Sequence, residues 1–232
     1  MIDFHAHILP CVDDGSKSVE ESILMLNSLA EQNVHTVIAT PHFYANDESV
    51  DAFVARRNAA YQQLMDHQPN APNIVLGAEV RYYDGISHLQ DLKKLRIDGT
   101  RFLLLEMPFN RWTEYAEKEI IDIACRGKIT LVLAHVERYL PFIDKDVLLR
   151  LRHNGVLFQV NASFFEGLFH STKAIRMLKD HLIQFVGSDC HNMQDRKPNI
   201  QKAVQAIQKK IGNHAFADFT EFGNILFRQN QL

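Results

Sequence analysis

Short apolar runs alternate along the sequence with longer stretches in which apolar residues recur every three or four positions. The short runs predict β-strands, and the periodic stretches predict amphipathic helices. The predicted strands cover residues 2–5, 35–40, 74–80, 102–107, 129–135, 156–162 and 183–189. The predicted helices cover residues 19–32, 49–66, 114–126, 145–153, 167–179 and 199–211, with a shorter one at 87–94.

This alternation predicts an α/β protein with a parallel sheet and helical crossovers. The predicted strands at 74–80, 102–107 and 129–135 are apolar almost throughout, as expected for strands that are buried on both faces. No linker or low-complexity segment divides the sequence, so we expect residues 1–232 to form a single domain. Periodicity alone leaves two architectures open, a closed and distorted (β/α) barrel and an open, doubly wound sheet.

Composition and charge exclude several classes of protein. The net charge of -3 is too close to neutral to favour a nucleic-acid partner or a membrane surface. The 3 cysteines are widely spaced and predict no disulfide framework, which fits a reducing compartment. No signal-peptide pattern opens the sequence, and no apolar run approaches the roughly 20 residues that span a bilayer. We therefore expect a cytoplasmic protein without membrane insertion.

Metal-ligand residue types stand at the carboxyl ends of six predicted strands, and the remaining strand ends in the polar Asn161. These residues are His5, His7, His42, Glu79, Glu106, His135, Asp189 and His191. In parallel β/α folds the carboxyl ends of the strands meet on one face, which is where active sites lie. Any one of these residues alone is readily explained as an ordinary polar group at a strand end, but the whole set is not.

Buried glutamates at the ends of apolar strands need compensation, which divalent cations supply. Mixed imidazole and carboxylate ligands suit manganese, iron or zinc, and the number of ligands exceeds what one ion takes, so two or three ions are expected. Clustered ions clamp a phosphoryl group and lower the pKa of a bridging water, so that hydroxide attacks phosphorus. The pattern therefore favours a metal-dependent phosphoric ester hydrolase.

Further charged residues lie close to these ligands. Asp13 and Asp14 follow the first histidines; they form a turn, hold a metal or orient His7, and Asp14 is slightly favoured as the ligand. Arg138 and Arg196 are candidate phosphate-binding residues, because a guanidinium group matches phosphate oxygens and neutralises developing charge. Arg81 has the same role only if its strand continues beyond Glu79.

A thiol mechanism is the rival chemical interpretation, since Cys190 and Arg196 have the Cys-x5-Arg spacing of thiol-dependent tyrosine phosphatases. The intervening loop contains no glycine to cradle a phosphate with backbone N–H groups. The neighbouring Asp189 and Asp195 would raise the pKa of the thiol. We therefore interpret the spacing as coincidental.

The order of these motifs resembles that of a known family. MIDFHAHILPCVDDGSKSVEES, ATPHFY, GAEVR, LLLEMP, LAHVERY and GSDCHN resemble segments of the PHP-superfamily tyrosine phosphatases encoded with bacterial capsule and exopolysaccharide genes. The superfamily shares the His-x-His start and the late Ser-Asp-x-His. The remaining motifs are similar to the phosphatase family more narrowly, and the resemblance weakens after about residue 199.

The resemblance implies a distorted, TIM-like (β/α)7 barrel, a preference for Mn²⁺, and a substrate that is a phosphotyrosine-containing protein. In this family the substrate is thought to be a tyrosine kinase that controls polysaccharide chain length. It also implies that the eight strand-end residues are metal ligands and that Arg138 and Arg196 bind phosphate. The sequence departs from the family pattern at Cys11, Val136 and Cys190, where Gly, Pro and Ala are usual.

Two alternative functions and one question about the C-terminal segment stay open at this point. A small-molecule phosphatase of the histidinol-phosphate type has the same superfamily motifs. A non-catalytic metal-binding regulator of a kinase is less favoured, because a binding module does not need so many clustered ligands. The apolar segment 213–232 either packs on the barrel or forms a homo-oligomer.

Overall fold

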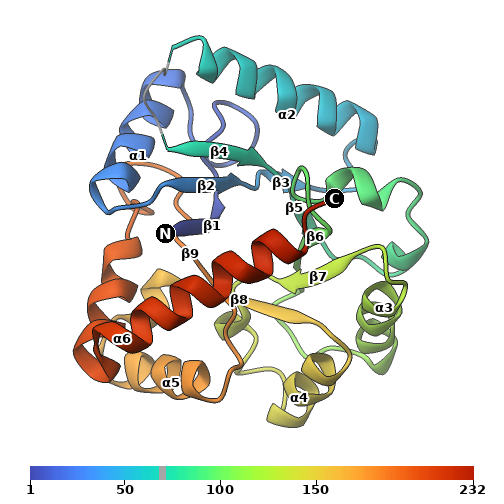
Figure 1. Ribbon diagram of the computed structural model, residues 1–232. Coiled ribbons are helices and arrows are strands. Elements are labelled where there is room, and N and C mark those ends of the chain that lie inside the picture. Colours follow the sequence, from blue (N-terminus) through green and yellow to red (C-terminus); the bar gives the residue numbers. More distant parts are fainter. Residues whose placement is uncertain (68–71) are drawn as a thin grey trace.

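The computed structural model describes residues 1–67 and 72–232, and its strands form a curled parallel barrel surrounded by helices (Figure 1). The strands are β1 (Ile2–Ala6), β2 (Thr36–Ala39), β3 (His42–Phe43), β4 (Asn73–Leu76), β5 (Glu79–Arg81), β6 (Phe102–Glu106), β7 (Thr130–Leu133), β8 (Leu157–Asn161) and β9 (Phe185–Gly187). All the paired strands are parallel.

Two of the predicted strands are each divided into two short ones. The strand predicted at 35–40 continues past Pro41 as β3, and the strand predicted at 74–80 is interrupted near Gly77 and continues as β5. Pro41 has no N–H to donate, which breaks the ladder at that point. Backbone pairing nevertheless continues, since the Glu79 N–H donates to the Pro41 carbonyl at 3.0 Å. The chain therefore follows the predicted path and bends where the site begins.

The strands form a closed barrel because backbone hydrogen bonds join the segment after β9 to β1. One sheet has the order β1-β2-β4 and the other the order β3-β5-β6-β7-β8-β9. The Asp189 N–H donates to the His5 carbonyl at 2.8 Å, and the His7 N–H donates to the Cys190 carbonyl at 2.9 Å. Of the two architectures that the pattern left open, the closed and distorted barrel is therefore confirmed.

The α-helices lie outside the strands. They are α1 (Val19–Glu31), α2 (Val50–Met65), α3 (Glu114–Cys125), α4 (Lys145–His153), α5 (Leu168–Lys179) and α6 (Ile200–Gln229). Short 3-10 helices are η1 (Ile86–His88), η2 (Leu92–Leu95), η3 (Val136–Arg138) and η4 (Ala162–Phe165). The single helix predicted at 87–94 is wrong in type, since two 3-10 turns occupy that region.

The last helix is longer than predicted and crosses one end of the barrel (Figure 1). Its path is kinked at Gly212, whose φ of 92° lies in the region that favours glycine. Beyond the kink, Leu226 and Phe227 pack against the smaller of two core clusters, and the ring centroid of Phe227 lies 6.2 Å from that of Phe102. Of the two predictions for segment 213–232, packing on the barrel is thus the one observed.

The barrel interior beneath this helix is filled by aromatic rings. Phe4 and Phe185 stack with their ring centroids 3.8 Å apart, and Phe102 meets both rings edge-on. All three are almost completely buried. The amino ends of the strands are therefore a closed apolar core, which leaves the carboxyl ends for the polar site. Within the described parts of the chain, no helix combines the length and apolarity that crossing a bilayer requires.

Candidate metal centre

The polar residues predicted at the strand ends meet at the carboxyl end of the barrel. They are His5, His7, His42, Glu79, Glu106, His135, Asp189 and His191. The His42 side chain is 13% exposed, whereas each of the others is at most 4% exposed as a residue. So many ionisable groups buried together need compensation of their charges by one another or by a bound cation.

Three groups of potential ligand atoms lie within this cluster. In each group the atoms lie within 4.8 Å of one another. The groups are His5, His7 and Asp189; His42, Glu79 and Glu106; and His7, Asp14, His42 and His191. Because His7 and His42 each belong to two groups, the groups form one continuous cluster, which suits several neighbouring ions.

Glu79, the first residue of β5, lies at the centre of the cluster. Its Oε2 lies 3.1 Å from His5 Nε2 and 3.2 Å from His7 Nε2, and also 3.1 Å from His42 Nδ1. Its Oε1 lies 2.9 Å from His135 Nε2. Burial alone would raise the pKa of this carboxyl. His5 and then His135 lower the pKa by more than burial raises it, so that the net pKa is well below its usual value. Glu79 is therefore an ionised carboxylate whose two oxygens face different histidines.

His5 and His7 present their Nε2 atoms to each other at 3.1 Å, beside two carboxylates. Asp189 Oδ1 lies 3.6 Å from the first Nε2 and 3.5 Å from the second, and Glu79 approaches both. Carboxylate oxygens that converge on a pair of nitrogen atoms repel one another unless a cation lies between them. This donor set of imidazole nitrogens and carboxylate oxygens fits a divalent metal ion.

His135 lies on the other side of Glu79, close to Glu106 as well. Its Nε2 is 3.4 Å from Glu106 Oε1. Burial lowers the pKa of His135, but Glu106 and Glu79 raise it more, to about 9. The two carboxylates thus stabilise a positive charge at this point, and a divalent cation meets the same electrostatic requirement.

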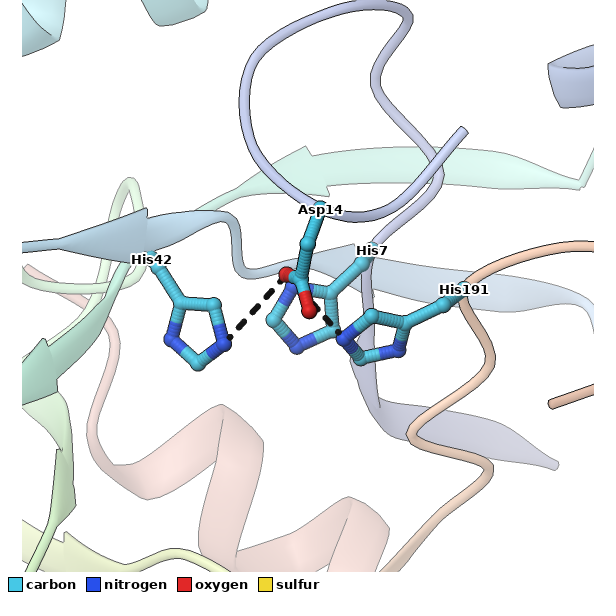
Figure 2. A group of neighbouring side chains, drawn as sticks. All are labelled: His7, Asp14, His42 and His191. Carbon is cyan, nitrogen blue, oxygen red and sulfur yellow. Dashed lines mark ion pairs between the residues drawn. The ribbon is translucent and has the colours of Figure 1, made fainter. Parts of the chain in front are cut away.

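The third group contains Asp14, which reaches in from the loop after β1 (Figure 2). Its Oδ1 lies 3.6 Å from His42 Nε2 and 3.5 Å from His191 Nε2. Burial lowers the pKa of both histidines, that of His191 to about 4, so that each imidazole is neutral and retains a lone pair. The buried His191 Nε2 has no hydrogen-bond partner among the residues described. These features also fit a metal site.

Asp13 and Asp14, which the sequence did not separate, have different positions. Asp13 Oδ2 accepts a hydrogen bond of 2.6 Å from His7 Nδ1 and another of 2.9 Å from the His42 N–H. Asp14 makes neither contact, and its side chain is 63% exposed. Asp13 therefore orients a histidine from behind, whereas Asp14 faces the cluster directly.

Arginines surround the entrance to the cluster. Arg138 and Arg196 donate to the same oxygen, Asp189 Oδ2, at 2.6 and 2.8 Å, and both side chains are 38% exposed. Strand β5 continues to Arg81, which pairs with Glu106 Oε2 at 2.5 Å. Three guanidinium groups are thus held over the carboxylates while remaining open to an anion from solvent.

The structure does not support the thiol mechanism. Cys190 is completely buried. Burial and the neighbouring Asp3 raise the pKa of its thiol far above the ordinary value, although the Ser188 hydroxyl lowers it slightly. A reactive cysteine needs an accessible thiolate, so Cys190 is a core residue of the β9–β1 junction.

Two amides of β8 support the centre but were not predicted as functional residues. Gln159 Oε1 accepts the His135 N–H at 2.7 Å and lies 3.2 Å from His5 Nδ1. Asn161 donates to Asp189 Oδ2 at 2.8 Å. Both are buried, and a polar amide at alternate positions of an otherwise apolar strand was the signal that the sequence offered.

Two departures from the family pattern have local structural explanations. Cys11 has a φ of 58°, a conformation that glycine adopts more readily. Val136 is the first residue of η3, where proline is well tolerated because an N–H at that position needs no helical partner. Neither change removes a group from the cluster.

Comparison with known proteins adds to this geometry. The family model described as "Capsular polysaccharide synthesis, CpsB/CapC" matches residues 1–224. Tyrosine-protein phosphatase YwqE of Bacillus subtilis is 33% identical over 241 residues, covering 100% of this chain and 93% of that protein. Putative tyrosine-protein phosphatase CapC of Staphylococcus aureus is 32% identical, with coverage of 100% and 93%.

Solved structures agree with the sequence matches. One from work on YwqE of Bacillus subtilis and CpsB of Streptococcus pneumoniae, described as unique metal-dependent tyrosine phosphatases, has a TM-score of 0.84 and 29% identity. The match covers 100% of this chain and 96% of that chain. The putative histidinol phosphatase hisK of Listeria monocytogenes has a TM-score of 0.51 and 13% identity, over 90% and 100% of the two chains, and shows a shared fold only.

Proposed function

The chain belongs to the capsular polysaccharide synthesis family CpsB/CapC, and from that premise we propose that it is a metal-dependent protein-tyrosine phosphatase. The observation that carries this proposal is the buried cluster around Glu79, in which carboxylate oxygens and imidazole nitrogens converge in groups suited to holding metal ions. Relatives that are named tyrosine-protein phosphatases, at 33% and 32% identity over the whole chain, support the choice of substrate.

We propose that the ions are held by the eight strand-end residues together with Asp14. All of these except His135 belong to the three groups of ligand atoms, and His135 lies against Glu79 and Glu106. When bound, two or three divalent ions supply Lewis-acid charge that polarises the phosphoryl oxygens and makes water a stronger nucleophile at neutral pH. Mn²⁺ is the ion expected from the family resemblance, and iron or zinc also suits the donor set.

The protein's own residues then bind and orient the phosphate. Arg138 and Arg196 are held by Asp189, and their exposed guanidinium groups can donate hydrogen bonds to two phosphoryl oxygens. Their charges also stabilise the negative charge that develops on these oxygens in the transition state. Since Cys190 is buried, its thiol takes no part in this mechanism.

The physiological substrate we propose is a phosphotyrosine-containing protein, specifically a bacterial tyrosine kinase that regulates capsular or exopolysaccharide synthesis. The family's description supports a role in polysaccharide synthesis, and the names of the relatives, tyrosine-protein phosphatases, support phosphotyrosine as the group that is hydrolysed. A single domain over residues 1–232, a cytoplasmic location and a possible homo-oligomer remain predictions from the sequence.

Substrate choice tests this proposal. Purified protein supplied with Mn²⁺ is expected to dephosphorylate a phosphotyrosyl peptide, and more slowly histidinol phosphate and a phosphoseryl peptide of the same sequence. Faster hydrolysis of histidinol phosphate would favour the small-molecule alternative. Binding of metal without turnover of any phosphomonoester would leave the protein as a regulator.

A further inference from the structure

Two exposed aromatic rings lie next to histidines of the candidate metal centre. Phe109, in the loop after β6, has its ring centroid 5.7 Å from that of His135. Tyr44, directly after β3, has its ring centroid 5.4 Å from that of His42. His135 contacts one carboxylate oxygen of Glu79 and His42 the other. Each ring therefore lies against a different histidine of the centre.

Neither ring is needed to fill the core. Phe109 is 42% exposed and Tyr44 is 41% exposed. Exposed aromatic surface beside a group of polar residues is suited to binding the apolar part of a ligand.

Phe109 is held in position by residues beneath it. Its ring lies 5.8 Å from that of the buried Tyr139, at an interplanar angle of 25°. Tyr139 in turn accepts a hydrogen bond of 2.9 Å from the Met107 N–H, and the Trp112 indole donates to the Pro108 carbonyl at 3.1 Å. The loop is thus fixed on both sides of the ring, which lowers the entropy cost of using it to bind a ligand.

Two of the arginines beside the cluster, one of them the proposed phosphate-binding Arg138, also lie close to this ring. The guanidinium carbon of Arg81 lies 5.4 Å from the centroid of Phe109, and that of Arg138 lies 6.0 Å away. These cation–π contacts place aromatic surface next to the groups that receive the phosphate. In an aryl phosphate, one ester oxygen separates the phosphorus from the ring, so a phosphate at the arginines brings its ring to this position.

We propose that Phe109 and Tyr44 form the walls of a slot that binds the phenyl ring of phosphotyrosine and selects aryl over alkyl phosphomonoesters. This inference rests on the proposed phosphatase function and assigns its leaving-group specificity to two residues. Aromatic rings that meet in offset or edge-to-face geometry gain affinity beyond their buried area, by a factor of about 2 to 10 for each pair.

Binding of phosphonates tests the slot separately from catalysis. The dissociation constants of benzylphosphonate and butylphosphonate are measured by calorimetry on the manganese-loaded protein, for the wild type and for Phe109→Leu, Tyr44→Leu and Phe109→Tyr. The wild type is expected to prefer the benzyl compound. Each leucine variant should lose about threefold to tenfold of that preference, whereas Phe109→Tyr, which keeps the ring, should retain it.

Phe222→Leu is the matched control, since Phe222 is 45% exposed and lies on α6, which crosses the opposite end of the barrel. It should leave both dissociation constants unchanged. An unchanged preference in both leucine variants would overturn the slot, and so would an equal loss of affinity for the two phosphonates, which would indicate a structural role. Turnover of a phosphotyrosyl peptide by the wild type is scored separately, so failure of the phosphatase function is distinguished from failure of the slot.

Discussion

Asp13 fixes the orientation of His7 through a hydrogen bond of 2.6 Å between its Oδ2 and the imidazole Nδ1. The carboxylate accepts and cannot donate, so Nδ1 carries the proton and Nε2 is left to face Glu79 and Asp189. The same oxygen of Asp13 accepts the His42 N–H, which couples the loops after β1 and β2. Partners of this kind tune metal affinity without touching the metal.

Replacing this carboxylate is expected to weaken metal binding while preserving the fold. Asp13→Ala should lower the affinity for Mn²⁺ about 10-fold to 100-fold, with activity recovering at high metal concentration. The check is a metal titration followed by both activity and calorimetry. Asp47→Ala, an exposed aspartate outside the site, is the control. Unchanged affinity in Asp13→Ala would show that His7 is oriented by other contacts.

His135→Ala should abolish hydrolysis. The substitution removes a proposed metal ligand that lies between Glu79 and Glu106, and the two carboxylates then repel each other without the imidazole between them. We expect a rate loss of about 10³-fold or more, which corresponds to several kcal/mol of transition-state stabilisation. Asp189→Ala should behave in the same way. Far-ultraviolet circular dichroism should show an intact fold in both, and near wild-type activity in either purified variant would refute the proposed ligand set.

Arg138→Ala should separate phosphate binding from metal binding. Among the proposed metal ligands described by the structure, the guanidinium group is hydrogen-bonded to Asp189 Oδ2, the oxygen that does not face His5 and His7, so metal content should change little. The rate should fall about 10²-fold to 10³-fold, as for the loss of one donor to a developing negative charge. Metal analysis and kinetics on the same sample decide between the two roles. A metal loss as large as that of a ligand variant would assign Arg138 a structural role instead.

The close approach of β9 to β1 predicts that Gly187→Ala destabilises the barrel. A Cβ at this position would lie 2.5 Å from His5 Cβ and 2.9 Å from the His5 nitrogen, and neither neighbour can move freely. The cost is expected to be about 1–3 kcal/mol in the free energy of unfolding. Gly223→Ala is the matched substitution, since its Cβ would meet only Gln184 O at 3.7 Å. That helical change should be neutral or stabilise by up to about 1 kcal/mol, as measured by chemical denaturation.

The sequence was most informative where local periodicity and the parallel topology agree. Predicted strands such as 102–107 and 156–162 were correct within a few residues, since apolar runs between turns depend on burial alone. In a parallel β/α barrel the carboxyl ends of all strands lie on one face. Residues such as His5 and Asp189 could therefore be assigned to that face before any distance was known.

The features that the sequence did not reveal depend on tertiary contacts. Nothing local separates Asp13 from Asp14, and only the path of the loop turns the first toward His7 and the second toward the cluster. Helix α6 continues beyond Gly212 because the barrel end beneath Leu226 and Phe227 needs an apolar cover. The support that Gln159 gives to His135 arises from the pairing of neighbouring strands rather than from any motif.

Hydrolysis of a chromogenic phosphomonoester by the purified protein tests the central claim most directly, in four arms: metal-stripped, stripped and resupplied with Mn²⁺, thiol-alkylated, and Cys190→Ser. The metal-centre account predicts activity that disappears on stripping, returns with Mn²⁺ and is unaffected by either thiol treatment. Activity that survives stripping but is lost with Cys190→Ser would contradict it.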